Sequence, residues 1–409
     1  MKWKKKMSKI DKIEKKLTRI YSYFDEIALK NQEKVLKALQ ENKIATRHFA
    51  GTTGYGYDDI GRDCLGKVFA SVFGAESAIV SPHITCGSHA IAIVLFGLLR
   101  PGDTMLSIAG KPYDTLDETI SGVEGENRGS LKDLGITYKQ VDLKNDELDF
   151  KKIISDLKEL QPKMVFLQRS RGYNWRNAIS IDDIEKCVQV VKKYSLNSIL
   201  VVDNCYGEFV AEKEPTEVGV DVIVGSLIKN PCGGLASTGA YIAGKQKYVE
   251  MISYRLTSPS LGTEVGSYEK GYREFYQGLF LAPHIVCQAI KGAYLIGEVL
   301  SDKGYEVMPK SNEVAGDIIK SIKFNDESAM ISFIQDIQKF SPIDSDAVPM
   351  PWDMPGYLDP IIMAAGTFVS GASIELSSDG PVKPPYVAYF QGALTYEHAK
   401  LVALHLLEK

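Results

Sequence analysis

Three residues with reactive side chains lie at the ends of two short apolar segments near the middle of the chain. Asp203 follows the apolar run Ile199–Val202. Ser226 and Lys229 follow a second run, Asp221–Gly225. Both runs are too short for helices and rich in β-branched residues, which predicts buried strands. Because open α/β sheets bind ligands at the carboxyl ends of their strands, we expect a carboxylate, a hydroxyl and an amine to meet there.

This combination is typical of pyridoxal phosphate (PLP) enzymes of the aspartate-aminotransferase fold type. In those enzymes an aspartate keeps the pyridine nitrogen protonated, and a lysine forms a Schiff base with the cofactor. A hydroxyl three residues before the lysine can reach the phosphate. Gly87 and Ser88, just before the predicted helix Ala90–Leu99, add backbone N–H groups suited to a phosphate. The alternative interpretation is an ordinary sheet with a solvated aspartate and a surface lysine.

Histidines and cysteines are spaced too irregularly to predict a metal site or a disulfide framework. His83, Cys86 and His89 lie close together, but their segment passes from strand through loop to helix and offers no fourth ligand. We therefore expect no metal. The six cysteines form no C-x-x-C pair, which in a chain this long predicts reduced thiols in a cytoplasmic protein.

A cluster of arginines follows the predicted strand Met164–Leu167. Arg169, Arg171 and Arg176 lie within eight residues of one another at this strand end. Guanidinium groups bind carboxylates through paired hydrogen bonds. We expect Arg171 to bind the substrate carboxylate, because the glycine beside it lets a ligand approach the backbone. The opposing interpretation pairs these arginines with acids at a subunit interface.

The composition excludes several classes of partner. The chain has 409 residues, with 48 Lys and Arg against 52 Asp and Glu. This near balance predicts neither nucleic acid nor a membrane surface as a partner. The longest apolar run, Ala90–Leu99, is ten residues and too short to span a bilayer. Lysines near the N-terminus are not followed by an apolar region, so we expect no secretory signal.

The length predicts more than one domain. Residues 8–40 have a helical period of apolar residues, which predicts an arm that packs either on a partner subunit or on its own core. Strands and helices alternate from residue 78 to residue 244, which predicts a mostly parallel sheet covered by helices. We place the domain boundary along the predicted helix Leu279–Leu300. The predicted division is a helical arm at 1–50, a large cofactor-binding domain at 51–285 and a small C-terminal domain at 286–409.

Within the small domain, apolar runs predict strands at Ala329–Ile334 and Ser373–Leu376 and a final helix at Glu397–Leu407. The proline-rich stretch Pro342–Pro360 is predicted to be a loop, either a lid over the site or a linker.

Six longer segments extend the PLP interpretation. They are GYGYDDIGRD (54–63), QRSRGYNWR (168–176), DNCYGEF (203–209), GSLIKNP (225–231), IIMAAGTF (361–368) and ELSSDGPVKPPYVAYFQGALTYEH (375–398). From about Arg47 to the C-terminus the chain resembles the PLP-dependent family of methionine gamma-lyases and aluminium resistance proteins, a branch of the cystathionine metabolism enzymes. The resemblance implies fold type I, an α/β fold. Its large domain has a mostly parallel sheet of the seven-stranded type, and its smaller C-terminal domain is α+β.

The resemblance also implies where the cofactor binds. Lys229 would be the Schiff-base lysine, and Asp203 would hold the pyridine nitrogen. Ser226 would bind the phosphate together with the backbone N–H groups of Gly87 and Ser88.

Three further positions carry implied roles. Tyr113 would stack on the cofactor ring and act as a catalytic acid or base. Tyr57 would reach the phosphate of a neighbouring subunit, so the active unit would be a homodimer or homotetramer. Lys383 stands where the family pattern has arginine, and its ammonium lacks the planar fork that grips a carboxylate. Lys383 is therefore the second candidate for substrate binding.

The implied activity is carbon–sulfur bond cleavage in an amino acid of the methionine, cystathionine or cysteine type. Lys229 would remove the α-proton, and elimination at the β or γ carbon would follow. An aminotransferase or another α-carbon PLP enzyme is an alternative, because the cofactor site alone does not choose the reaction. A second alternative is a weakly catalytic PLP-binding protein that serves stress tolerance.

Overall fold

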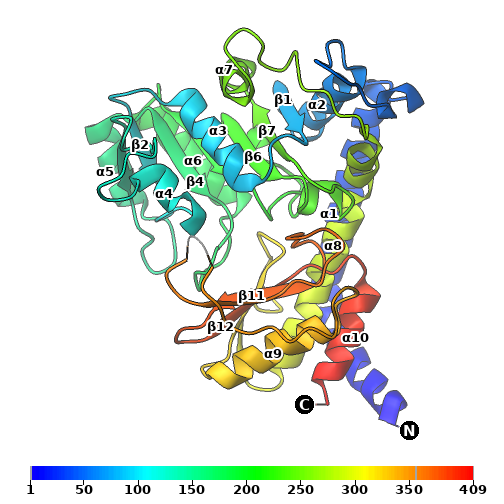
Figure 1. Ribbon diagram of the computed structural model, residues 1–409. Helices are drawn as coiled ribbons and strands as arrows, with labels where there is room; N and C mark the ends of the chain where they lie inside the picture. The colour runs from blue at the N-terminus through cyan, green and yellow to red at the C-terminus, as the bar shows by residue number, and fades with distance from the viewer. Residues whose placement is uncertain (1, 355–356, 409) are drawn as a thin grey trace.

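A seven-stranded sheet forms the centre of the larger domain in the computed structural model, which describes residues 2–354 and 357–408 (Figure 1). The strands lie in the order β1–β7–β6–β5–β4–β2–β3. Neighbours from β6 through β3 are parallel, whereas β7 is antiparallel to both of its neighbours. The expected mostly parallel sheet is confirmed. The strands are β1 (Ser77–Ser81), β2 (Thr104–Ser107), β3 (Thr137–Gln140), β4 (Met164–Gln168), β5 (Ile199–Asp203), β6 (Val222–Ser226) and β7 (Ala240–Gly244).

Helices cover both faces of this sheet, so every residue of the central strands β4 to β7 is buried. Along β5, Ile199 and Val201 pack on the face covered by α3, α4 and α7, while Leu200 and Val202 pack on the other face. Such two-sided burial explains why the strands are continuous apolar runs. The helices of this domain are α2 (Ile60–Val72), α3 (Gly87–Leu98), α4 (Asp117–Ser121), α5 (Phe150–Leu160), α6 (Ile181–Tyr194) and α7 (Gln246–Leu256), with short 3₁₀ turns η1 (Thr46–Phe49), η2 (Asp114–Leu116), η3 (Pro215–Val218) and η4 (Asn230–Cys232).

Two long helices run side by side through the molecule, α1 (Lys2–Glu41) and α8 (Arg273–Ser301) (Figure 1). The apolar face of α1, including Ile13, Leu17 and Phe24, is buried within its own chain. The arm therefore folds back on its own core. Helix α8 is long and apolar enough to cross a membrane, but 67% of its apolar window is buried inside the protein, as in a core helix.

The smaller domain is built on a second sheet of five antiparallel strands, in the order β10–β11–β12–β9–β8. The predicted domain boundary between residues 285 and 286 falls inside α8, which contacts η4 of the large domain and both α10 and β8 of the small one. The elements are β8 (Glu306–Met308), β9 (Lys320–Lys323), α9 (Glu327–Lys339), β10 (Ile361–Ala364), β11 (Ser377–Pro381), β12 (Val387–Gln391) and α10 (Tyr396–Leu406).

Two predicted strands of the small domain are wrong. Ala329–Ile334 belongs to α9, which begins where the Asp326 side chain accepts a hydrogen bond from the Ala329 N–H. Buried residues in this helix, such as Met330, Phe333 and Ile334, recur at helical spacing. Ser373–Leu376 precedes β11 rather than forming a strand.

Candidate active site

A cavity of about 200 Å³ lies where β4, β5 and β6 end, between the two sheets. Of the nine predicted site residues, it brings together six: Gly87, Ser88, Tyr113, Asp203, Ser226 and Lys229. The small domain contributes the opposite wall. The cavity-lining residues of that wall include Ile319, Asp379, Tyr389 and Gln391.

Lys229 enters this cavity from the turn after β6. Its Nζ lies 3.9 Å from the centroid of the Tyr206 ring. Tyr206 has a φ of 71°, a left-handed conformation that a tyrosine adopts only where the surrounding structure holds it. Burial alone lowers the pKa of Lys229, but Tyr206, Cys205 and Asp203 outweigh burial and leave that pKa above its usual value. The amine is thus held among groups that favour its cationic form.

Asp203 is the last residue of β5 and is 6% exposed. One of its carboxylate oxygens accepts a hydrogen bond of 3.1 Å from the Cys205 N–H. Burial raises the pKa of Asp203, whereas the nearby charge of Lys229 lowers it. A buried carboxylate of this kind favours a cationic partner within the cavity.

The N-terminus of α3 lies at the same cavity, which Gly87 and Ser88 line. A Cβ added to Gly87 would lie 3.5 Å from Cys205 Sγ and 3.7 Å from Ser226 Cβ, so this helix end lies beside the end of β6. The hydroxyl of Ser88 is within 2.8 Å of the Thr115 hydroxyl. A helix N-terminus flanked by serine hydroxyls is suited to an anion such as a phosphate.

Tyr113 lies on the loop after β2 and meets the proline-rich loop of the small domain. Its backbone N–H donates a hydrogen bond of 2.7 Å to Gln168 Oε1, and its hydroxyl pairs with the hydroxyl of Tyr357. Burial raises the pKa of Tyr113 above its usual value. Residues 355 and 356 of the predicted loop Pro342–Pro360 lie outside the described part of the chain. Of the two alternatives for this loop, contact of Tyr357 with Tyr113 favours the lid.

Asp379 was not predicted as a site residue, although it lies in the quoted segment 375–398. Burial raises its pKa to about 7, while hydrogen bonds from Tyr173 and Gln391 and the charge of Lys229 act in the opposite direction. The sequence offered no signal that this strand residue faces Lys229, because the facing depends on how the two domains meet. The other unpredicted lining residues include Cys86, Gln168, Tyr173, Cys205, Tyr206, Tyr389 and Gln391.

Arg171 lies outside the cavity, although the sequence predicted that it binds the substrate carboxylate. Its side chain is fully buried, and its guanidinium donates to both carboxylate oxygens of Asp317 at 2.9 and 3.2 Å. It also donates to the Met308 carbonyl and the Ser321 hydroxyl. Arg171 is not among the residues that line the cavity. The guanidinium instead ties the loop after β4 to the small domain, so its acidic partner belongs to the same chain and not to a subunit interface.

The two neighbouring arginines also donate hydrogen bonds to groups of the same chain. Arg169 donates to Asn204 and to the Gly207 carbonyl, and Arg176 donates to the carbonyls of Ser170 and Asn177. Both are buried, at 1% and 2% exposure.

The two remaining predicted residues also lie outside the cavity lining. Lys383 is half-exposed and forms an ion pair of 2.6 Å with Asp359. Tyr57 is 55% exposed, and its ring lies 5.6 Å from that of Tyr55. Among the described residues that line the cavity, Lys229 is the sole lysine and none is an arginine.

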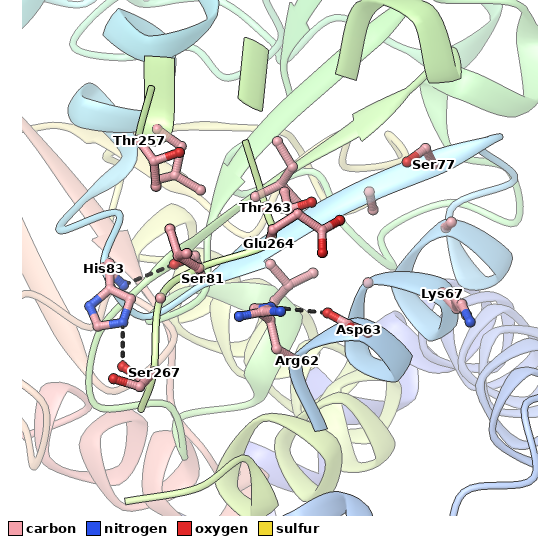
Figure 2. A pocket seen from close by; sticks show the side chains of 18 of the residues that line it. Arg62, Asp63, Lys67, Ser77, Ser81, His83, Thr257, Thr263, Glu264 and Ser267 are labelled. Carbon is pink, nitrogen blue, oxygen red and sulfur yellow. Dashed lines mark hydrogen bonds and ion pairs between the residues drawn. The ribbon is translucent and has the colours of Figure 1, made fainter. Parts of the chain in front are cut away.

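A second, larger cavity of about 710 Å³ lies beside the first strand of the large sheet (Figure 2). It is bounded by α2, β1 and the loop around residues 256–267. Figure 2 shows the Arg62–Asp63 ion pair and the hydrogen bond between the His83 ring and the Ser267 carbonyl. Neither Lys229 nor Asp203 reaches this cavity. In the described part of the chain, no group of three or more His, Cys, Asp or Glu side chains could hold a metal ion.

The sequence of the chain matches known proteins over nearly its whole length. A model of the methionine gamma-lyase family matches residues 6–409. The uncharacterized protein YnbB of Bacillus subtilis (strain 168) is 49% identical over 389 residues, which cover 95% of this chain and 92% of that protein.

Two solved structures share the fold. A carbon–sulfur lyase involved in aluminum resistance from Clostridium novyi NT is 50% identical, with a TM-score of 0.94 over 99% of this chain and 95% of its own. The pyridoxal-5'-phosphate-dependent protein YhfS from Escherichia coli is 15% identical, with a TM-score of 0.63 over 94% of this chain and 96% of its own. The latter similarity concerns the fold alone, which is fold type I of the PLP-dependent enzymes.

Proposed function

Because the chain belongs to the methionine gamma-lyase family, we propose that it is a PLP-dependent carbon–sulfur lyase that acts on a sulfur amino acid. The observation that carries this proposal is the convergence of Lys229, Asp203 and the N-terminus of α3 on one cavity. These groups arise from separate segments of the chain, and each matches a different part of the cofactor.

The donor set of the cavity fits PLP. The N-terminus of α3, with Gly87 and Ser88, and the hydroxyl of Ser226 would hold the phosphate. Asp203 would accept a hydrogen bond from the protonated pyridine nitrogen, and Lys229 would attach the cofactor aldehyde. Bound PLP supplies an acceptor for the electrons released when the substrate α-proton leaves.

The protein side chains would then move the protons. Lys229 Nζ would take the α-proton of the substrate, because Lys229 is the only lysine among the described residues that line the cavity. The Tyr113 hydroxyl would hold or donate a proton near the substrate sulfur, and Tyr357 would orient that hydroxyl. Elimination at either the β or the γ carbon is compatible with this arrangement.

We further propose that the active unit is a homodimer or homotetramer. Tyr55, Tyr57 and Ile60 are 73%, 55% and 48% exposed. Large apolar side chains exposed together are typical of a surface that another protein covers. They lie in the segment next to the larger cavity, which Gly54 lines. A second copy covering this region would bring its Tyr57 toward the phosphate end of the neighbouring site. All six cysteines are free, which supports a cytoplasmic setting.

Incubation with methionine, cysteine, cystathionine and homocysteine tests the function. We expect equal amounts of a keto acid, ammonia and a sulfur product from at least one of the four. The sulfur product is a thiol from methionine or cystathionine and hydrogen sulfide from cysteine or homocysteine. Amino transfer that requires an added keto acid and releases no thiol would instead identify an aminotransferase. Cofactor binding without turnover of any substrate would favour the weakly catalytic stress protein.

A further inference from the structure

Asp379 is a carboxylate on the small-domain wall that none of the proposed roles uses. It lies in the middle of β11, next to Gly380. A Cβ at Gly380 would lie 2.8 Å from the Met330 Cε of α9, so that side of the strand faces the helix. Because side chains alternate along a strand, Asp379 points to the opposite face, toward the large domain. Its place in the cavity lining beside Lys229 agrees with this orientation.

Tyrosine rings surround this carboxylate. Tyr389 pairs directly with Asp379 across β11 and β12, and the Tyr173 ring lies 5.2 Å from the Tyr389 ring. The Tyr357 ring lies 5.7 Å from that of Tyr173. Gln391 Nε2 donates a hydrogen bond of 3.4 Å to Asp379 Oδ2. A carboxylate among aromatic rings is the combination that binds organic ammonium ions, through charge-assisted hydrogen bonds and cation–π contacts.

The charges of the cavity favour the same kind of ligand. Among the described residues that line it, the carboxylates are Asp203 and Asp379, and Lys229 is the cation. The proposed function engages both Lys229 and Asp203 with the cofactor, whose phosphate adds further negative charge. Asp379 is then left to face the substrate side chain. A cationic group there would be attracted, and a purely apolar one would leave the carboxylate desolvated without compensation.

We propose that Asp379 binds an ammonium group carried by the substrate side chain beyond the sulfur atom. The inference rests on the proposed function, and it narrows the substrate to diamino thioethers, of which cystathionine is one. The substrate α-amino group cannot serve, because it is used at the cofactor. Methionine ends in a methyl group and offers Asp379 no partner.

Two amino acids that lack a carbon–sulfur bond allow binding to be measured without carbon–sulfur cleavage. L-Lysine carries a distal ammonium, and L-2-aminoheptanoate carries a methyl group in its place. Titration calorimetry with the wild-type holoenzyme should give at least about tenfold tighter binding of lysine. In Asp379→Asn that preference should fall to about one, and in Asp379→Glu part of it should return. Asp302→Asn removes a surface carboxylate that pairs with Lys16 and should keep the full preference.

The kinetic counterpart compares cystathionine with methionine. Asp379→Asn should lower the ratio of their kcat/KM values by about tenfold, whereas a parallel fall for both substrates would overturn the assignment. Equal wild-type affinities for lysine and aminoheptanoate would also overturn it, and this measurement requires no variant to fold. If no sulfur amino acid releases a thiol while the lysine preference still depends on Asp379, the proposed lyase function fails and the ammonium site stands.

Discussion

Two lysines place their amines against tyrosine rings, one in each domain. Lys229 Nζ lies 3.9 Å from the Tyr206 ring centroid, and Lys320 Nζ lies 4.0 Å from that of Tyr294. Lys320 is 2% exposed and donates a hydrogen bond of 2.6 Å to the Pro309 carbonyl. The immediate contacts of the two amines are therefore alike.

Their charged surroundings differ. Tyr206, Cys205 and Asp203 raise the pKa of Lys229, whereas burial and the adjacent Arg171 lower the pKa of Lys320 to about 7. Burial lowers the pKa of both groups, so the neighbouring groups decide which amine stays charged, and Lys320 faces the Arg171 cation. Lys229 lines the cavity at the ends of β4, β5 and β6, whereas Lys320 is not among the described residues that line it. Five predictions test this comparison.

The largest effect is expected from Lys229→Ala. Loss of the amine should remove the visible absorption band of bound cofactor and lower turnover at least about a thousandfold. Absorption spectra and thiol release measure both. Lys320→Met is the matched control, because it removes the other buried amine and should keep the band and the turnover. A Lys229→Ala protein that retained the absorption band and the turnover would contradict the assignment of the site.

Asp317→Asn probes the charges around the second lysine. Asp317 is the carboxylate that pairs with fully buried Arg171, and Arg171 in turn faces Lys320. Leaving this guanidinium unpaired should lower the free energy of unfolding by about 3–5 kcal/mol, measured by urea denaturation.

Arg171→Lys separates the structural role from the one expected on sequence. Because its guanidinium bonds to Asp317 and not to the cavity, this variant should lose stability while KM for the amino acid stays unchanged. A raised KM at unchanged stability would return Arg171 to substrate binding.

Asp203→Asn removes the carboxylate that lines the same cavity as Lys229. We expect kcat to fall about a hundredfold, because the protonated pyridine nitrogen would lose its negative partner. Steady-state kinetics at saturating cofactor measures the effect. Turnover equal to wild type would show that another group holds the ring nitrogen.

The last prediction concerns how the stability of Lys320→Met changes with pH. The folded pKa of Lys320 is about 7, below the usual 10.5, so between these values the unfolded chain holds a proton that the folded chain lacks. Wild-type stability from this group therefore rises with pH, by up to about 1.4 kcal/mol per unit. The methionine variant lacks this slope, and its advantage over wild type should be greatest below pH 7 and shrink toward pH 10.5. Urea unfolding at several pH values checks this, and parallel curves for the two proteins would contradict it.

Much of the large domain could be predicted because its signals are local. Apolar runs bounded by turns identified β4, β5 and β6, and the parallel register then brings Asp203 next to Val224 of the neighbouring strand. In the small domain, the apolar run Ala329–Ile334 fits either a strand or a helix. The cap by Asp326 and packing against the sheet made it helical.

What the sequence by itself determined is the side of the cavity where we propose that the cofactor binds. Asp203, Ser226 and Lys229 lie at the carboxyl ends of adjacent strands, and that position follows from residue type and strand order alone. Only the tertiary structure decided the opposite side, where we propose that the substrate side chain binds. Arg171 meets a carboxylate 146 positions away, and Asp379 faces Lys229 across the domain junction. Those contacts depend on how the two sheets pack against each other. The periodicity of apolar residues within a strand or helix does not predict that packing.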